Sequence, residues 1–123
     1  MDQKPVTDNI LVIEGAGGVM VPLNKKEFVV DLILKLEASV IIVSRNELGS
    51  INHSLLTARA LTEQNIKVMG WIFNDEYLDY ESEIVAWSGF PWIASVRKLE
   101  VINKSVIHSQ SVKIKEQLMR FKT

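Results

Sequence analysis

A carboxylate followed by a run of glycines is the first stretch of this sequence whose residue types could do chemistry. Glu14 ends an apolar run, and Gly15, Gly17 and Gly18 follow within four positions. Glycines let a ligand approach the backbone closely, and successive free N–H groups can cradle an anion. A carboxylate at a strand end could hold Mg²⁺, which takes one or two carboxylates with phosphate oxygens and water. The stretch therefore indicates either a metal and phosphate site or a tight turn with an ordinary exposed acid.

A second stretch combines a glycine turn with the expected start of a helix. Gly49 precedes a helix whose expected N-cap is Ser50 or Asn52. Free N–H groups at such a helix start favour an anion such as a carboxylate, although plain capping needs no ligand and explains the same residues. His53 could act as a base, but no Ser or Asp partner stands at a triad spacing, so a structural role is simpler.

Polar residues also follow the third apolar run. Asn74 could pair with the edge of a nucleotide base, because its amide both donates and accepts hydrogen bonds. Asn74 and Asp75 are equally good turn residues. His108 lies in a polar tail and indicates little. The tryptophans are most simply core or interface residues; they are Trp71, Trp87 and Trp92.

Two nucleotide-binding fingerprints are missing or incomplete. The sequence contains no Gly-Lys pair, so the phosphate-binding loop G-x-x-x-x-G-K-[ST] is absent. The dinucleotide pattern G-x-G-x-x-G fits poorly, because Met20 stands where the third glycine is needed. A nucleotide-dependent oxidoreductase that uses residues 14–18 as a dinucleotide turn is therefore a disfavoured alternative.

Short apolar runs alternate with helix-like segments along the chain. Strands are expected over residues 9–16, 39–45, 67–75 and 91–96. Helices are expected over residues 25–37, 52–65, 77–89 and 111–122. Uninterrupted apolar runs suit strands buried on both faces, and interleaved helices imply right-handed crossovers between parallel strands. The alternation predicts an α/β fold, a doubly wound parallel sheet of about four strands with flanking helices, in a single domain over residues 1–123.

Details of the expected helices follow from single residues. Leu55, Leu56 and Leu61 fall roughly on one side of the helix over residues 52–65. Asn65 is expected to cap the end of that helix, and Gly89 to end the helix that follows. In a doubly wound sheet, ligands bind beyond the carboxyl ends of the strands, which is where all the polar stretches above fall.

The amino-acid composition limits which binding partners and which cellular location we expect for this chain. The 123 residues, 47% hydrophobic and 24% charged, suit one globular domain with a core. A net charge of −1 implies no basic face, so we expect neither nucleic acid nor a membrane as a partner. The absence of cysteine excludes thiolate chemistry and is compatible with the cytoplasm, which is the expected location. We expect no secretory signal and no membrane span, because the start is polar and the apolar runs are short.

Four segments together and in order resemble one family, dethiobiotin synthetase, an enzyme of biotin biosynthesis. The segments are VIEGAGGVMVPLN, VIIVSRNELGSINHSLLTARAL, VMGWIFND and PWIASV, which agree in order and spacing over about residues 9–96. The resemblance implies a P-loop-NTPase-like fold and an ATP-dependent cyclo-ligase. In the implied reaction 7,8-diaminopelargonate takes up CO₂ as a carbamate, whose oxygen attacks the γ-phosphate of ATP. The second amine then closes a cyclic urea, while Mg²⁺ neutralises the charge that develops on the phosphates.

The resemblance also implies roles for single residues. Glu14 resembles the family's carboxylate that is associated with Mg²⁺. The family's backbone cradle near phosphate and carbamate is matched here by Gly15, Ala16 and Gly17. Asn74 and Asp75 resemble the pair that contacts adenine. A third set resembles the family's nucleotide-binding strand edge, which lies near the base; it comprises Pro91, Trp92 and Ile93. The residues that resemble the receptor for the substrate carboxylate, across a homodimer interface, are Gly49, Ser50, Ile51 and Asn52, with Tyr80 matching a tyrosine that assists there.

One large part of the family pattern has no counterpart in this sequence. It comprises the P-loop strand and helix, the P-loop lysine, a second catalytic lysine and an aspartate for Mg²⁺, and no catalytic residue is identified here. By resemblance the chain supplies half of the site, and without the lysine it should bind ATP feebly. A bare strand edge then invites association, as a homodimer or with a missing N-terminal half. The alternative is a non-catalytic truncated remnant that acts as a binding or assembly module.

Overall fold

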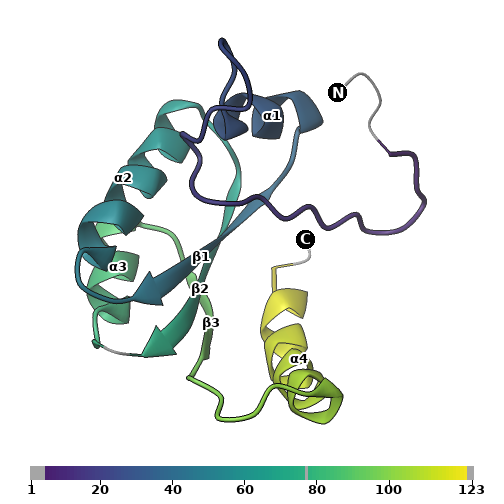
Figure 1. The fold of residues 1–123 in the computed structure, drawn as a ribbon, viewed down its shortest axis with the longest axis vertical. Coiled ribbons are helices and arrows are strands. Elements are labelled where there is room, and N and C mark those ends of the chain that lie inside the picture. The colour runs from purple at the N-terminus through teal and green to yellow at the C-terminus, as the bar shows by residue number, and fades with distance from the viewer. Residues whose placement is uncertain (1–4, 77, 122–123) are drawn as a thin grey trace. The chain divides into compact units, whose positions relative to one another are not determined.

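The computed structural model describes residues 5–76 and 78–121 (Figure 1). The chain forms two compact units, residues 1–38 and residues 39–123, and each is described by itself. The single domain expected over residues 1–123 stays a prediction. Within the described ranges no helix has the length and apolar character needed to cross a membrane.

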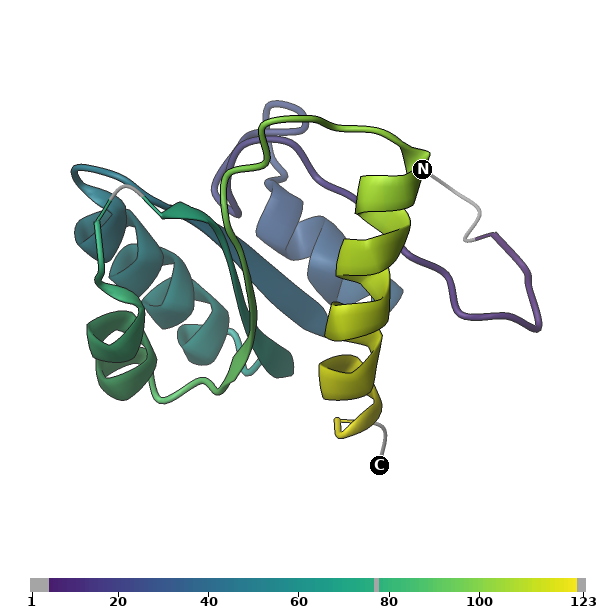
Figure 2. The same ribbon diagram turned by 90° about the horizontal axis from the view of Figure 1, so that it is seen from below.

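The second unit is built on a parallel sheet. Its strands, in spatial order, are β1 (Val40–Asn46), β2 (Val68–Glu76) and β3 (Trp92–Val96). Its helices are α2 (Ser50–Glu63), α3 (Glu81–Ser88) and α4 (Lys104–Met119). Figures 1 and 2 show α2 and α3 side by side on one face of the sheet and α4 on the other side, beside β3. The predicted α/β class, with a parallel sheet and flanking helices, is confirmed.

The sheet has three strands where about four were expected, because the strand expected over residues 9–16 is wrong. Residues 9–16 form neither helix nor strand, and the side chain of Val12 is 85% exposed. A strand forms only where a neighbouring strand makes hydrogen bonds with its backbone N–H and C=O groups. An apolar run without such a neighbour does not become a strand, whatever its composition.

Burial on both faces, expected for all strands, fails for β1. In β3, Ile93 and Ala94 are both buried. In β1, Ile42 is buried whereas its neighbour Val43 is 64% exposed. Helix α4 packs mainly against β3, at the other side of the sheet from β1.

Helix α2 packs on the sheet through mainly small side chains. The buried positions recur at helical spacing and are Ser50, Ser54, Ala58 and Leu61. The Ser54 hydroxyl lies 2.8 Å from the Ser44 hydroxyl of β1. Leu56, expected on the same side as Leu61, is 58% exposed, so that expectation is wrong. Small side chains at three of the four buried positions allow the helix backbone to come close to the sheet.

Trp71 and Phe73 of β2 form the centre of the core. Both are fully buried, and their rings stack with centroids 5.7 Å apart. The Trp71 indole N–H donates to the Ser88 hydroxyl of α3 at 2.8 Å, so the polar atom of this large side chain is satisfied. The interpretation of Trp71 as a core residue is confirmed, whereas Trp87 is mostly exposed.

Two helix ends follow the expected signals, whereas the starts of α3 and α4 differ from those expected. Asn65 takes a left-handed backbone (φ 54°) after α2, and Gly89 (φ 73°) ends α3, as expected. The helix expected over residues 77–89 begins at Glu81, and residue 77 itself lies outside the described residues. The helix expected from residue 111 begins at Lys104. The last difference has a clear cause, because the Asn103 carboxamide accepts the N–H of Val106 at 2.9 Å and caps the helix early.

The first unit contains helix α1 (Val29–Leu36), which begins later than the expected residue 25. A turn occupies residues 24–27 instead, because the Asn24 carboxamide oxygen accepts the N–H groups of Lys26 and Glu27. A hydrogen bond from Lys35, together with one from Asn24 and the Lys35 charge, lowers the pKa of Glu27. Backbone hydrogen bonds from Val29 to Val21 and from Val30 to Val19 connect α1 to the segment after the glycine run.

A close backbone approach at Gly70 joins β2 to β3. The N–H of Trp71 donates to the Pro91 carbonyl at 2.8 Å. A Cβ atom on Gly70 (φ 148°) would lie 2.4 Å from that carbonyl oxygen and 2.9 Å from Ile93 Cγ1. Only glycine fits this contact without a backbone shift.

We therefore expect Gly70→Ala to lower the free energy of unfolding by at least about 2 kcal/mol, because overpacking and backbone strain act together. Urea denaturation of both proteins measures the loss. Gly18→Ala is the matched control, since no atom lies within 4 Å of the added methyl group. Equal stability of the two variants would contradict the close approach.

Candidate functional site

The carboxyl ends of the three strands meet at one edge of the second unit. Arg45 of β1 pairs with Asn74 of β2, and Asn74 pairs with Val96 of β3. The predicted nucleotide residues Asn74 and Asp75 therefore lie at the edge where ligands bind in parallel sheets. Asn74 is exposed there and is available to a ligand.

Asp75 lies in a β-bulge and is held by an ion pair. The register of β1 against β2 shifts after Arg45, so Asn46 pairs with Glu76 and Asp75 is the extra residue. Asp75 has a positive φ of 54°, and its carboxylate receives the Arg45 guanidinium Nε at 3.2 Å. The bulge turns this carboxylate toward Arg45, so its Oδ2 atom is already engaged at the strand end.

A chain of hydrogen bonds crosses the same edge and joins β1, α3 and β3. The Glu81 carboxylate accepts the Asn46 carboxamide N–H at 3.2 Å and the Ser95 hydroxyl at 2.5 Å. The Ser95 oxygen in turn accepts the Trp92 indole N–H at 2.8 Å. Glu81 is the first residue of α3, where the positive end of the helix dipole favours a carboxylate.

This network was missed by the sequence interpretation, apart from Trp92. One signal was available: Ile42, Ser44 and Asn46 alternate along β1 and therefore share a face. The position of Asn46 in the strand thus indicates that its side chain faces the protein interior. Its partner Glu81 is distant in the sequence and belongs to no motif, so the pairing could not be predicted.

Two buried polar atoms of the described residues have no hydrogen-bond partner there. They are the Asn46 carboxamide oxygen and the Ser50 hydroxyl. Both residues lie at the carboxyl end of β1 or just after it, and both side chains are buried. Unpaired buried polar atoms are costly and concentrate where structure serves function.

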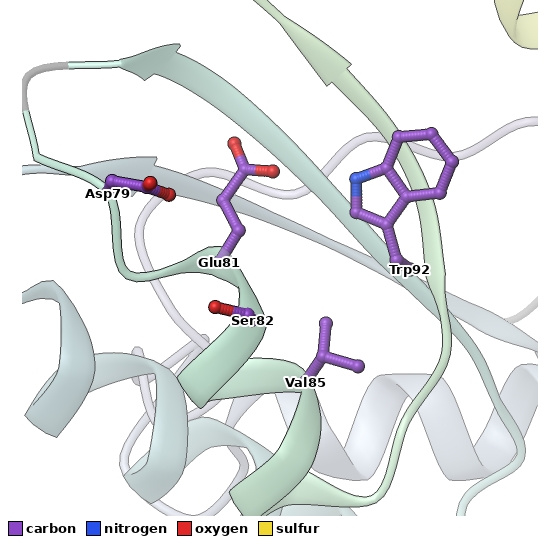
Figure 3. Close-up of a pocket in the computed structure, with 5 residues that line it drawn as sticks. All are labelled: Asp79, Glu81, Ser82, Val85 and Trp92. Carbon is purple, nitrogen blue, oxygen red and sulfur yellow. The ribbon is translucent and has the colours of Figure 1, made fainter.

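A hollow of about 340 Å³ lies beside this network (Figure 3). It is lined by Asp79, Glu81, Ser82, Val85 and Trp92. Figure 3 shows the Trp92 indole nitrogen facing the Glu81 carboxylate, and Trp92 as a residue is 44% exposed. An aromatic surface flanked by carboxylates suits a flat group that carries N–H donors, whereas the same carboxylates repel phosphate.

The nucleotide-binding residues predicted around the start of β3 differ in which of their groups a ligand could contact. Pro91 is exposed, but its carbonyl accepts the N–H of Trp71. The Ile93 side chain is fully buried in the core, so only its backbone could reach a nucleotide. Trp92 alone of the three presents a large side chain toward the hollow.

The start of α2 differs from the expected capping arrangement. Gly49, with a φ of 88°, is the N-cap residue, and no side chain forms a cap hydrogen bond, so the predicted caps Ser50 and Asn52 are wrong. The turn needs a positive φ that only glycine adopts easily, which moves the cap one residue earlier than expected. Ser50 is buried, whereas Asn52 and His53 are exposed. Tyr80 is the N-cap residue of α3, and its carbonyl accepts the N–H of Ile84.

The glycine run of the first unit forms a constrained turn. Gly17 has a φ of 83°, and an added Cβ would lie 2.7 Å from Val21 Cγ2. The N–H of Val21 donates to the Gly18 carbonyl at 3.1 Å. Glu14, Gly15 and Ala16 are exposed in front of this turn. The run is thus held by local backbone contacts and leaves its acidic side chain accessible.

The described residues do not bring together a complete metal site. Among them, no three His, Asp or Glu side chains are grouped closely enough to hold an ion. Glu14 by itself fits only the coordination in which a protein supplies one carboxylate and phosphate oxygens and water supply the rest.

Comparison with known proteins decides the family. The AAA domain family matches residues 1–106. The chain belongs to this family. It is 47% identical over 115 residues to ATP-dependent dethiobiotin synthetase BioD of Cytophaga hutchinsonii, which covers 91% of this chain and 55% of that protein. It is 41% identical over 117 residues to the synthetase of Christiangramia forsetii, with 94% and 56% covered.

The resemblance to dethiobiotin synthetase is thereby confirmed. The synthetase of Neorickettsia sennetsu is 44% identical over 107 residues, which covers 78% of this chain and 43% of that protein. The chain spans about half the length of the relatives it matches.

The hydrogen bond between the buried Asn46 and the half-buried Glu81 leads to a stability prediction. Asn46→Asp places a second carboxylate beside Glu81, so the folded state must bind a proton more tightly than the unfolded chain does. We expect a loss of about 3 kcal/mol at pH 7 that shrinks as the pH falls toward 4, because protonation removes the repulsion. Urea denaturation across this pH range measures it.

Asn52→Asp is the control, since it makes the same charge change at an exposed position of a helix start. A loss of stability for Asn46→Asp that does not depend on pH would show that the carboxamide does not face Glu81.

Proposed function

We propose that this chain takes part in the ATP- and Mg²⁺-dependent conversion of 7,8-diaminopelargonate to dethiobiotin, a ligase reaction of biotin biosynthesis in the cytoplasm. The supporting observation is the similarity to dethiobiotin synthetases, which extends over all four motif segments. Those segments carry the exposed polar residues at the carboxyl edge of the sheet and the constrained glycine turn.

The proposed reaction has three balanced steps. One amine of the substrate adds to CO₂ and loses a proton, which forms a carbamate. A carbamate oxygen attacks the γ-phosphorus of ATP, and ADP leaves. The second amine attacks the activated carbonyl and loses a proton, the cyclic urea closes, and phosphate leaves. Most of the protein's contribution to such chemistry is the positioning and neutralisation of charge.

Adenine recognition is proposed for the edge of β2 and β3. Asn74 is exposed and can pair with a base through its donor and acceptor groups, with Asp75 beside it. Trp92 would offer its ring to the base in the hollow, and Pro91 and Ile93 flank it along the chain. The acidic lining favours the amino group of a base there and disfavours a phosphate.

Metal and phosphate binding are proposed for the glycine turn. Glu14 would supply one carboxylate to Mg²⁺, and the backbone of Gly15, Ala16 and Gly17 would approach phosphate and carbamate oxygens. The metal would neutralise the charge that develops on the transferred phosphoryl group.

Substrate binding is proposed for the start of α2. The first turn of the helix, with Gly49, Ser50, Ile51 and Asn52, would receive the substrate carboxylate on its N–H groups. The exposed Asn52 carboxamide can donate to the same carboxylate, and Tyr80 assists. In the proposed homodimer this contact is made across the interface.

A chimera tests the proposed function. This chain replaces the matching segment of the Cytophaga hutchinsonii synthetase, and dethiobiotin formation is measured from 7,8-diaminopelargonate, bicarbonate, ATP and Mg²⁺. We expect turnover. A folded chimera that binds ATP but forms no product, while the parent enzyme is active, would favour the alternative of a binding or assembly module.

In the same chimera we expect Glu14→Gln to lower turnover by at least about 100-fold, because the metal loses its charged ligand. The secondary structure should be unchanged, since Glu14 is exposed. The assay is repeated over a range of Mg²⁺ concentrations. Unchanged activity at all of them would mean that Glu14 does not bind the metal.

A second variant separates the two substrates. Asn52→Ala should raise the KM for the diamine about tenfold and leave the KM for ATP unchanged, because only the carboxylate contact is lost. Steady-state kinetics with each substrate varied in turn measures both values. Equal increases would contradict the placement of the substrate carboxylate at α2.

A further inference from the structure

The Glu81 carboxylate connects the ends of two strands that are not neighbours in the sheet. β1 and β3 lie on opposite sides of β2, yet Asn46 of β1 and Ser95 of β3 both donate to Glu81. Each carboxylate oxygen has one of these partners, at 3.2 Å and 2.5 Å. Helix α3 is thereby attached by one side chain to both outer strands of the sheet.

The direction of every hydrogen bond in this chain is determined. A carboxylate only accepts, so the Asn46 amide nitrogen must face Glu81. For the same reason the Ser95 hydroxyl gives its single proton to Glu81, which leaves the Ser95 oxygen to accept from the Trp92 indole N–H. The orientation of the Trp92 ring therefore depends on Glu81 through Ser95.

We propose that Glu81 is a positioning residue of the nucleotide site, which holds the Trp92 indole in the orientation that receives the base. This inference rests on the adenine site proposed above. Glu81 acts through Ser95, and a partly exposed indole without this connection could rotate away from the hollow. Hydrogen bonds to an ionised acceptor are stronger than those between neutral groups, so a carboxylate can fix the orientation of the Ser95 hydroxyl firmly.

A nearby residue provides a matched control. Glu83 stands in the same first turn of α3, carries the same charge and is exposed, where it accepts a hydrogen bond from Ser82. Removal of Glu83 changes the charge at the helix start as removal of Glu81 does, but it leaves the connection to Trp92 intact.

The experiment uses the full chain labelled with ¹⁵N, and it compares wild type with Glu81→Ala, Glu81→Gln and Glu83→Ala. NMR spectra without nucleotide report the indole N–H signals of Trp71, Trp87 and Trp92, and a titration with Mg·ATP gives the Kd. For Glu81→Ala we expect the Trp92 signal to move and the Kd to rise about tenfold. Glu81→Gln, which can still accept one hydrogen bond, should show a smaller rise, and Glu83→Ala none.

A second variant keeps the inference testable if Glu81→Ala fails to fold. Ser95→Ala cuts only the connection between Glu81 and Trp92, so we expect the same movement of the indole signal and the same weaker binding. Wild-type affinity in a folded Glu81→Ala or Ser95→Ala protein overturns the positioning role alone. An absence of Mg·ATP binding by the wild-type chain overturns the proposed adenine site, and the inference with it.

Discussion

The backbone contact between β2 and β3 at Gly70 is the constraint on which the rest of the second unit depends. The Pro91 carbonyl reaches the N–H of Trp71 only because Gly70 has no side chain to stand between the strands. This contact sets the register in which Trp71 pairs with Trp92 and Asn74 with Val96. The register then determines which side chains reach the carboxyl edge together.

The bulge where β2 pairs with β1 changes which polar side chains reach the carboxyl edge. Because Asp75 is the extra residue, Asn46 lies opposite Glu76, while Arg45 is directed to the Asp75 carboxylate. The Asn46 side chain is buried and reaches Glu81 at the start of α3. The edge that results is rich in carboxylates, and an aromatic ring lies exposed beside them. Such a surface suits the base of a nucleotide better than its phosphates.

The parts of the fold that depend on local pattern could be predicted from the sequence. Three of the four apolar runs are strands, and Gly89 and Asn65 end helices because a left-handed residue is needed there. The run over residues 9–16 is apolar and β-branched like the true strands, and it does not form a strand because strand formation depends on a neighbour as well as on composition. The early start of α4 depends on a single side chain, Asn103, whose capping role is easily overlooked in a polar segment.

The candidate site was predictable only where residues carry a recognisable motif. Asn74, Asp75 and Trp92 stand in segments that resemble the family, and the structure places Asn74 and Asp75 at the carboxyl edge. Trp92 is the first residue of β3 and extends toward that edge only through its indole, which donates to Ser95. Asn46 and Ser95 stand inside segments that resemble the family but carry no role there, and Glu81 stands in none of the four segments. Their connection exists only after the strands pair and α3 packs, so a single sequence contains no pattern that joins them.

The central claim is that the carboxyl edge of the sheet binds the base of ATP. Backbone amide chemical shifts of the ¹⁵N-labelled chain during titration with Mg·ATP test it most directly, because NMR detects weak binding as well as strong. We expect the largest shifts at Asn74, Asp75, Trp92 and the start of α3, with little change along the exposed residues of α4. Shifts confined to α4, or spread evenly over the chain at high nucleotide concentration, would contradict the claim.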